Sequence, residues 1–128
     1  MKTRKRKSKY NARKVEMFGL KFDSKLESQR YIYLRSLVDA GDIRKLRVHP
    51  WYELAPSFTD RDGKRWRAIN YEADFEYLTN GGQMVVEDAK GYETDVYRIK
   101  RKLFLRQYPD IVFRQVKTAT APVYGGEG

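Results

Sequence analysis

The chain has 128 residues, a net charge of +10 and no cysteine. This length predicts one domain with a modest core, and the lack of cysteine excludes disulfides, thiolate zinc sites and a cysteine nucleophile. No apolar run is long enough to cross a membrane. No signal peptide is expected, because the charged N-terminus is not followed by an apolar stretch.

The positive charge is concentrated at the N-terminus. Residues 1–14 hold eight of the 27 Lys and Arg residues and no acid, so the rest of the chain is nearly neutral. We predict that this segment is a flexible arm that binds nucleic acid by releasing counterions from the phosphates. A solubilising or ribosome-binding tail is the alternative. The residues expected to contact nucleic acid here are Lys5, Arg6, Lys7 and Lys9.

A helix is predicted over residues 24–40. Ser24 is a good N-cap, and Glu27 completes an S-x-x-E capping box with it. Gly41 suits the position that follows the last turn of a helix. The residues that follow the cap at helical spacing are Leu26, Arg30, Tyr33, Leu34 and Leu37.

The next part of the chain reads as extended structure interrupted by turns. Residues 43–54 are partly apolar and predicted to be extended, with Pro50 and Pro56 as breakers. Asp62-Gly63 predicts a hairpin turn.

Two antiparallel strands are predicted after that turn. Residues 64–77 are rich in aromatics and alternate well enough to form one long strand. A second turn at 80–82 then leads into a strand over 83–89, which pairs antiparallel with the preceding one.

The hydrophobic period changes after Gly91, where a basic helix is predicted. Thr94 or Asp95 caps this helix and Pro109 ends it. The residues that form its apolar stripe are Val96, Ile99, Leu103 and Phe104.

A last strand is predicted over residues 111–116. A helix between two strands with short connections indicates a right-handed crossover, so this strand should run parallel to 83–89. Residues 117–128 have little to pack and are predicted to form a flexible tail. The expected fold is a small α/β domain over residues 15–116, in which a mixed sheet is flanked by helices.

Strand alternation separates the two acids of the VVEDAKG segment. Residues two apart share a face of a strand, so Asp88 and Lys90 point one way, and Glu87 points the other way with Ala89. Counting outward from the turn places Asp74 roughly opposite Asp88, with their Cβ atoms about 5 Å apart. Glu87 is expected to make a salt bridge or a hydrogen bond to a helix.

Two unpartnered carboxylates at that distance repel, so a cation between them or protonation of one is expected. Mg²⁺ binds one or two carboxylates together with water and a substrate phosphate. With a lysine beside them, Asp74 and Asp88 are the groups needed for metal-assisted phosphodiester hydrolysis. Simpler interpretations stand beside this one. Asp74 could form only a salt bridge with Lys90, and capping alone explains Glu27. His49, the only histidine, is expected to be structural rather than a general base.

The predicted element order and the acidic motif together resemble the PD-(D/E)xK nuclease superfamily, whose restriction-endonuclease-like core is α-β-β-β-α-β. Asp74 matches the acid on its second core strand, and Asp88 and Lys90 match the acid-x-lysine on the third. Branches that include archaeal Holliday-junction resolvases and the endonuclease subunit of the Tn7 transposase add a glutamate on the first helix, which Glu27 in FDSKLES matches. The chain departs from the pattern at Ala73, where proline is common.

Five segments are similar, more closely, to an uncharacterised family of small phage proteins assigned to this superfamily: KYNARK, FDSKLES, YEADFEY, VVEDAKG and TDVYRIKRKLF. The resemblance covers residues 9–116. It implies a DNA endonuclease that binds Mg²⁺, with Mn²⁺ as a substitute. The ligands it implies are Asp74, Asp88, the Ala89 carbonyl and Glu27, directly or through water. Lys90 would orient the attacking water and offset charge in the transition state.

The resemblance also implies the partners. The expected substrate is branched or junction DNA, cut by a homodimer in the cytoplasm of a bacterial host during phage recombination. On the helix after the motif, Lys100 and Arg101, with Tyr97, are candidates for contacts to the DNA backbone, and a solvated basic face is the alternative. Two other functions stay open: another nuclease of the same fold, such as a nickase, flap or restriction-like enzyme, and a non-catalytic nucleic-acid-binding protein.

Overall fold

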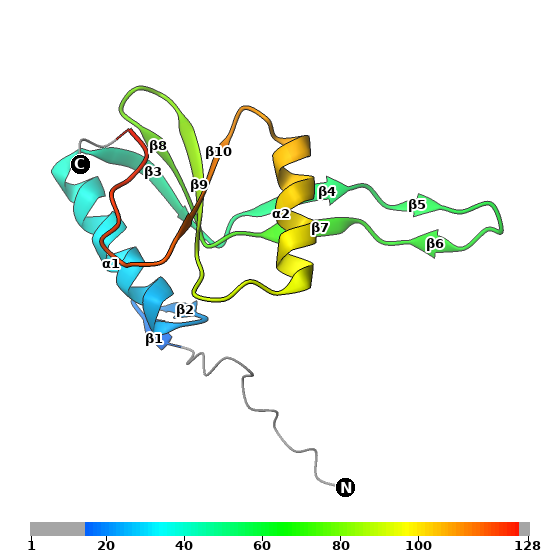
Figure 1. Cartoon of the computed structure of the whole chain (residues 1–128), viewed down its shortest axis with the longest axis horizontal. Helices are drawn as coiled ribbons and strands as arrows, with labels where there is room; N and C mark the ends of the chain where they lie inside the picture. Colours follow the sequence, from blue (N-terminus) through cyan, green and yellow to red (C-terminus); the bar gives the residue numbers. More distant parts are fainter. Residues whose placement is uncertain (1–14, 126–128) are drawn as a thin grey trace, which may run out of the picture.

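The computed structural model describes residues 15–125. A four-stranded sheet lies between two helices, and a long two-stranded arm extends away from it (Figure 1). Neither helix in this described part is long and apolar enough to span a membrane. The basic N-terminal segment, which was predicted to be flexible, lies outside the described residues. It holds the candidate contacts Lys5, Arg6, Lys7 and Lys9.

The first helix, α1 (Lys25–Ala40), begins where the capping signal predicts. Ser24 Oγ accepts a hydrogen bond from the N–H of Glu27 at 3.1 Å. The Glu27 carboxylate completes the cap one residue farther out, because its Oε1 accepts from the N–H of Asp23 at 2.9 Å. The helix ends at Gly41, whose φ of 83° lies in the left-handed region that favours glycine.

Four strands form the central sheet in the order β10-β9-β8-β3. Only β9 and β10 run parallel, and the other neighbours are antiparallel. The second helix, α2 (Asp95–Gln107), connects the two parallel strands as a crossover. The order α1-β3-β8-β9-α2-β10 confirms the α/β fold, with a mixed sheet flanked by helices. The strands are β3 (Ile43–Val48), β8 (Phe75–Thr79), β9 (Met84–Ala89) and β10 (Val112–Val116).

The two faces of the sheet pack against different helices. One core cluster joins Phe75, Tyr77 and Val85 to α1 through Leu34. The other joins Val86 to α2 and to the base of the arm. Neighbouring residues of β9 therefore belong to different cores, which is the alternation expected of a strand covered on both sides.

The arm leaves the central sheet next to Asp74. The prediction of one strand over 64–77 is therefore wrong. The chain bends at Ala73 and Asp74, and only the part after the bend pairs with β9. The part before it pairs with the segment that follows Pro50, and so builds the arm (Figure 1). The strands of the arm are β4 (Trp51–Ala55), β5 (Phe58–Thr59), β6 (Arg65–Trp66) and β7 (Ile69–Glu72).

The buried stripe of α2 also differs from the prediction. Val96 and Ile99 are 62% and 59% exposed, whereas Tyr97 and Phe104 are buried. The aromatic residues at the base of the arm explain this difference. The Phe104 ring packs edge-on against Tyr52 of β4 at 5.0 Å between centroids, and this contact turns the aromatic side of the helix inward.

The two ends of the described chain pack against α1. A short hairpin that the sequence did not predict, β1 (Val15–Met17) and β2 (Leu20–Phe22), precedes the helix. The predicted tail 117–128 is also not loose over its described part. Val123 is buried in the α1 cluster, and Arg30 Nη1 donates to the Ala119 carbonyl at 3.0 Å.

Candidate active site

Asp74 and Asp88 face each other across two neighbouring strands. The β8–β9 pairing continues past Phe75 and Glu87 and places Asp74 opposite Asp88, as predicted. The N–H of Asp74 donates to Oδ1 of Asp88 at 2.9 Å, and the N–H of Ala89 donates to Oδ2 of Asp74 at 2.8 Å. Each carboxylate is therefore fixed by a backbone N–H from the other strand.

Both aspartates are almost completely removed from water, with 8% of Asp74 and 1% of Asp88 exposed. Burial raises the pKa of each to about 7, the negative charge of Glu27 adds to both rises, and the charge of Lys90 opposes them. Oδ2 of Asp88 is buried without a hydrogen-bond partner in the described part of the chain. A carboxylate in this state is unfavourable, and binding a proton or a cation would relieve it.

Glu27, in the first turn of α1, lies close enough to the two aspartates for its charge to raise their pKa values. Only 1% of it is exposed, and burial raises its pKa. Its Oε1 accepts from the N–H of Asp23, and its Oε2 lies 2.7 Å from Nε2 of His49. The N–H of His49 donates to the carbonyl of Asp74 at 2.9 Å. The lone histidine therefore connects two of the predicted site residues.

His49 has an unusual backbone conformation. Its φ of 57° lies in the left-handed region, which is uncommon for a residue other than glycine. Pro50 follows it, and the chain changes there from the central sheet to the arm. The side chain is 27% exposed, so the imidazole is accessible from outside while it contacts Glu27.

Lys90 follows β9 and, by alternation, lies on the side of Asp88. Its ammonium is close enough to both aspartates to oppose the rise of their pKa values. Nζ of Lys90 lies 5.3 Å from the ring centroid of Tyr97, and the Arg101 guanidinium lies 5.2 Å from the same centroid. Tyr97 is only 6% exposed, so its ring positions two cations rather than offering a surface to DNA.

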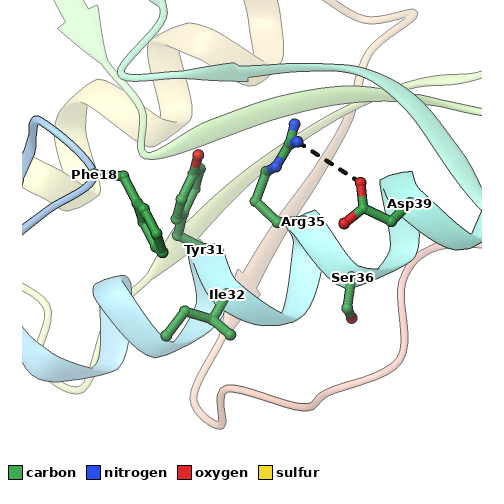
Figure 2. Close-up of a pocket in the computed structure, with 6 residues that line it drawn as sticks. All are labelled: Phe18, Tyr31, Ile32, Arg35, Ser36 and Asp39. Atoms are coloured by element: carbon green, nitrogen blue, oxygen red, sulfur yellow. Dashed lines mark ion pairs between the residues drawn. The ribbon is translucent and has the colours of Figure 1, made fainter.

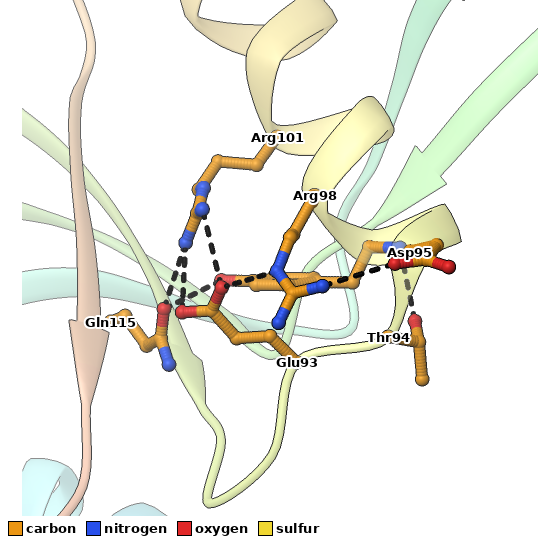
Figure 3. Close-up of polar contacts among 7 residues, drawn as sticks. Glu93, Thr94, Asp95, Arg98, Arg101 and Gln115 are labelled. Atoms are coloured by element: carbon orange, nitrogen blue, oxygen red, sulfur yellow. Dashed lines mark hydrogen bonds and ion pairs between the residues drawn. The ribbon is translucent and has the colours of Figure 1, made fainter.

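A polar network beside the site holds Arg101 in place (Figure 3). Nη1 of Arg101 donates to Oε2 of Glu93 at 3.1 Å and to Oε1 of Gln115 at 3.0 Å. Gln115 lies on β10 directly opposite Asp88. Arg101 is therefore engaged in contacts within the protein, although 29% of its side chain is exposed. Lys100, the other candidate DNA contact on this helix, is half-buried.

Glu87 points to the other face of the sheet, where it forms a structural ion pair. Nε and Nη2 of Arg30 each donate to one of its oxygens at 2.7 Å, and the Tyr77 hydroxyl also donates to it. Both charged side chains are fully buried. The prediction of a salt bridge from Glu87 to a helix is confirmed.

The chain was compared with known families, curated proteins and solved structures. A family described as a protein of unknown function, DUF1064, matches residues 7–122. The chain belongs to the DUF1064 family. No curated protein and no solved structure matches it. The match spans both helices, the arm and Glu27, Asp74, Asp88 and Lys90, but the family description assigns no role to any of them.

The resemblance implies a bound Mg²⁺, and the side chains of this DUF1064 chain fit such an ion only in part. Within residues 15–125, no group of three or more His, Cys, Asp or Glu side chains is arranged to hold a metal ion. Both oxygens of Glu27 already have partners. Asp74 and Asp88 fit better, because two carboxylates with raised pKa values and one unpartnered oxygen are a donor set that Mg²⁺ accepts together with water and phosphate. A role for the Ala89 carbonyl stays a prediction.

A pocket of about 450 Å³ lies along α1, on the side of the β1–β2 turn (Figure 2). None of the predicted site residues lines it, so the candidate site is defined by its carboxylates and not by this pocket. The lining residues are Phe18, Tyr31, Ile32, Arg35, Ser36 and Asp39.

Sequence reasoning missed two residues at the site. Gln115 could have been found, because strands 111–116 and 83–89 were predicted to pair in parallel. Only the register of this pairing, which places Gln115 beside Asp88, was missing. The contact between His49 and Glu27 had no local signal. It depends on how α1 packs against the end of β3, which the hydrophobic pattern does not determine.

Proposed function

We propose that this chain is a metal-dependent DNA endonuclease, a hydrolase that cleaves phosphodiester bonds. The pair Asp74–Asp88 carries the proposal. Two buried carboxylates on adjacent strands, each with a pKa of about 7, are unfavourable unless a cation or proton joins them. Perturbed groups of this kind cluster at functional sites. The match of Asp74, Asp88 and Lys90 to the PD-(D/E)xK motif supports the same activity.

Each residue has a distinct role in this proposal. Asp74 and Asp88 would hold the divalent ion, and backbone N–H groups of the opposite strand fix the orientation of both carboxylates. Bound Mg²⁺ supplies Lewis acidity and lowers the pKa of a coordinated water. The Lys90 ammonium offsets the charge that develops on the phosphoryl oxygens. Glu27 would join the site through water, or directly if its Oε1 released the N–H of Asp23.

The test uses the two neighbouring acids as a matched pair. Wild type, Asp88→Asn and Glu87→Gln are incubated with Mg²⁺ on junction, flap, single-stranded and duplex DNA, below the unfolding midpoint of every variant. We expect Asp88→Asn to lose cleavage and Glu87→Gln to keep most of it, because the second change affects only the core ion pair. EDTA should stop the reaction. Cleavage that survives in Asp88→Asn but is lost in Glu87→Gln would contradict the proposal.

The finer proposal is a resolvase of branched DNA, acting as a homodimer in phage recombination in the cytoplasm of a bacterial host. It rests on the resemblance to resolvases, and a basic N-terminal segment suits recognition of phosphates and DNA shape. Paired symmetric nicks in a four-way junction are the expected product. Sequence-specific cuts in linear duplex would instead indicate a restriction-like enzyme, and single nicks or flap removal would indicate a nickase or a flap nuclease.

A second candidate is a non-catalytic nucleic-acid-binding protein. The lack of a ready three-ligand metal group within residues 15–125 favours it. This candidate predicts DNA binding without cleavage in Mg²⁺ or Mn²⁺. It also predicts that Asp74→Ala affects DNA binding no more than the replacement of an exposed acid such as Asp110.

A further inference from the structure

The tip of the arm carries two large aromatic side chains that are substantially exposed. Phe58 of β5 and Trp66 of β6 are direct partners in the antiparallel pair, and their rings stack at 6.5 Å between centroids and 20° between planes. They are 55% and 43% exposed. The Lys64 ammonium lies 4.1 Å from the centroid of the Trp66 ring. We call Phe58, Lys64 and Trp66 the tip platform.

The other side of the ribbon carries basic residues, and the loop adds an exposed arginine that pairs with the neighbouring Asp62. Thr59 and Arg65 point away from the tip platform, because they alternate with its rings along the strands. Arg61 in the loop is 95% exposed, and Arg67 beyond β6 is exposed as well. A flat aromatic face combined with arginines is the combination that binds unpaired nucleic acid.

Hydrogen bonds within the loop hold the tip of the arm in its conformation. Oδ1 of Asp60 accepts from the N–H groups of Asp62 and Lys64, both at 2.9 Å, and Oδ2 accepts from Nε1 of Trp66 at 2.8 Å. Gly63 has a φ of 87°, the left-handed conformation that this loop needs. The Asp60 carboxylate is therefore occupied within the loop, and the stacked rings are ordered before any ligand arrives.

We propose that the arm tip binds DNA at unpaired or unstacked bases, with the tip platform stacked on a base and the neighbouring arginines on phosphates. This inference rests on the proposed DNA substrate. A continuous duplex covers the faces of its bases, so a stacking surface selects single strands, forks and junctions. The arm would then supply the preference for branched DNA, which the carboxylates alone do not explain.

The arm also connects the tip to the candidate active site. β7 leads through Ala73 directly into Asp74, which lies eight positions after Trp66. An extended chain of that length spans at most about 29 Å. At a rise of about 3.4 Å per nucleotide, this is roughly eight nucleotides. A base held at the tip and a phosphate at Asp74 would therefore lie on the same short stretch of DNA.

The two tryptophans of the chain allow a direct test, because Trp51 lies at the base of the arm and Trp66 at its tip. Trp51→Phe leaves Trp66 as the only indole, and Trp66→Phe leaves Trp51 as the matched control. Fluorescence is followed in EDTA while forked, single-stranded or blunt duplex DNA is added to the full chain. We expect quenching of Trp66 by forked and single-stranded DNA, and little quenching by duplex. Trp51 should be unaffected.

Binding measurements give the magnitude. Phe58→Ala should weaken binding to forked DNA by about 5- to 150-fold, the range for loss of one stacked aromatic. The control is Tyr124→Ala. Tyr124 is 44% exposed, an exposed fraction similar to that of Trp66, but it lies outside the arm. The double variant Arg61→Gln, Arg67→Gln should keep the tip platform and reduce the slope of log affinity against log salt by about 1.4 to 1.8.

The inference is overturned if Trp66 emission does not respond to DNA, or if Phe58→Ala and the arginine variant bind as wild type does. A change in sedimentation with the arm variants, without a change in DNA binding, would instead identify a contact between copies of the chain. All binding is measured without metal, so the two proposals can fail separately. A chain that binds through its tip but never cleaves loses only the nuclease assignment, and one that cleaves with an inert tip loses only this inference.

Discussion

Replacing the buried Asp88 with Asn should stabilise the metal-free protein above neutral pH. Asp88 is 1% exposed, and Oδ2 has no hydrogen-bond partner in the described chain. An ionised carboxylate at this position loses its hydration only in the folded state, so its ionisation destabilises the folded protein. The amide of Asn is similar in shape, keeps an acceptor for the N–H of Asp74, and carries no charge.

The magnitude follows from the pKa of Asp88, which burial raises from 3.8 to about 7. Between these two values the folded protein holds a proton that the unfolded chain has released, so stability falls as pH rises from 3.8 to 7 and then levels off. From pH 5 to pH 8 the loss is about 2.5 kcal/mol for this one group. In the variant, the amide leaves a buried donor unsatisfied, but this cost is the same at every pH because the amide does not titrate. The free energy of unfolding of the variant, relative to that of wild type, should therefore rise by about 2.5 kcal/mol from pH 5 to pH 8.

The assay is thermal unfolding of wild type and Asp88→Asn in EDTA at pH 5, 6, 7 and 8. At about 3–5 °C per kcal/mol for a chain of this length, the difference in midpoint should shift by about 10 °C across the series in favour of the variant. Glu87→Gln is the control. It should lower the midpoint at every pH, because Glu87 is paired with Arg30. Parallel curves for wild type and Asp88→Asn would refute the claim that this carboxylate is destabilised in the folded state.

Three further predictions concern the metal, the core and the N-terminus. Mg²⁺ should raise the unfolding midpoint of wild type at pH 8 but not that of Asp88→Asn, because only wild type offers both carboxylates; equal shifts would place the ion elsewhere. Arg30→Leu should lower the free energy of unfolding in urea by about 3–5 kcal/mol, because it leaves Glu87 buried and unpaired. The double change with Glu87→Leu should recover part of this loss, and no recovery would contradict the pairing. Deleting residues 1–9 removes six basic residues and should reduce the salt slope of DNA binding by up to about five; an unchanged slope would show that the segment does not touch DNA.

Local signals predicted the parts of the fold that depend on neighbours in sequence. The ends of α1 follow from Ser24 and Gly41, which satisfy the orphan backbone groups of the first and last turns. The turn at 80–82 set the register of the two strands it joins. That register, with simple alternation, was enough to place Asp74 opposite Asp88 and to send Glu87 to the other face.

Tertiary contacts explain what the sequence did not predict. An alternating pattern over 64–77 is the same whether the chain stays in one sheet or bends at Asp74 into an arm, so the arm had no signal of its own. In α2, Val96 and Ile99 are more apolar than Tyr97, but the aromatic base of the arm packs against Tyr97 and Phe104. The burial of this helix therefore depends on an element whose existence the pattern did not indicate.

The two acids of VVEDAKG are connected through α1, even though they lie on opposite faces of β9. Glu87 holds Arg30 in a buried ion pair, and Arg30 lies one turn after Glu27 on the same helix. The first turn of α1 is therefore fixed relative to β9 by the acid that takes no part in the proposed chemistry. The negative charge of Glu27 lies close enough to raise the pKa of Asp74 and Asp88, and this ion pair helps to hold its helix against the sheet. It follows that weakening the ion pair should disturb Glu27 before it disturbs Asp74 and Asp88, which their own strands hold in place.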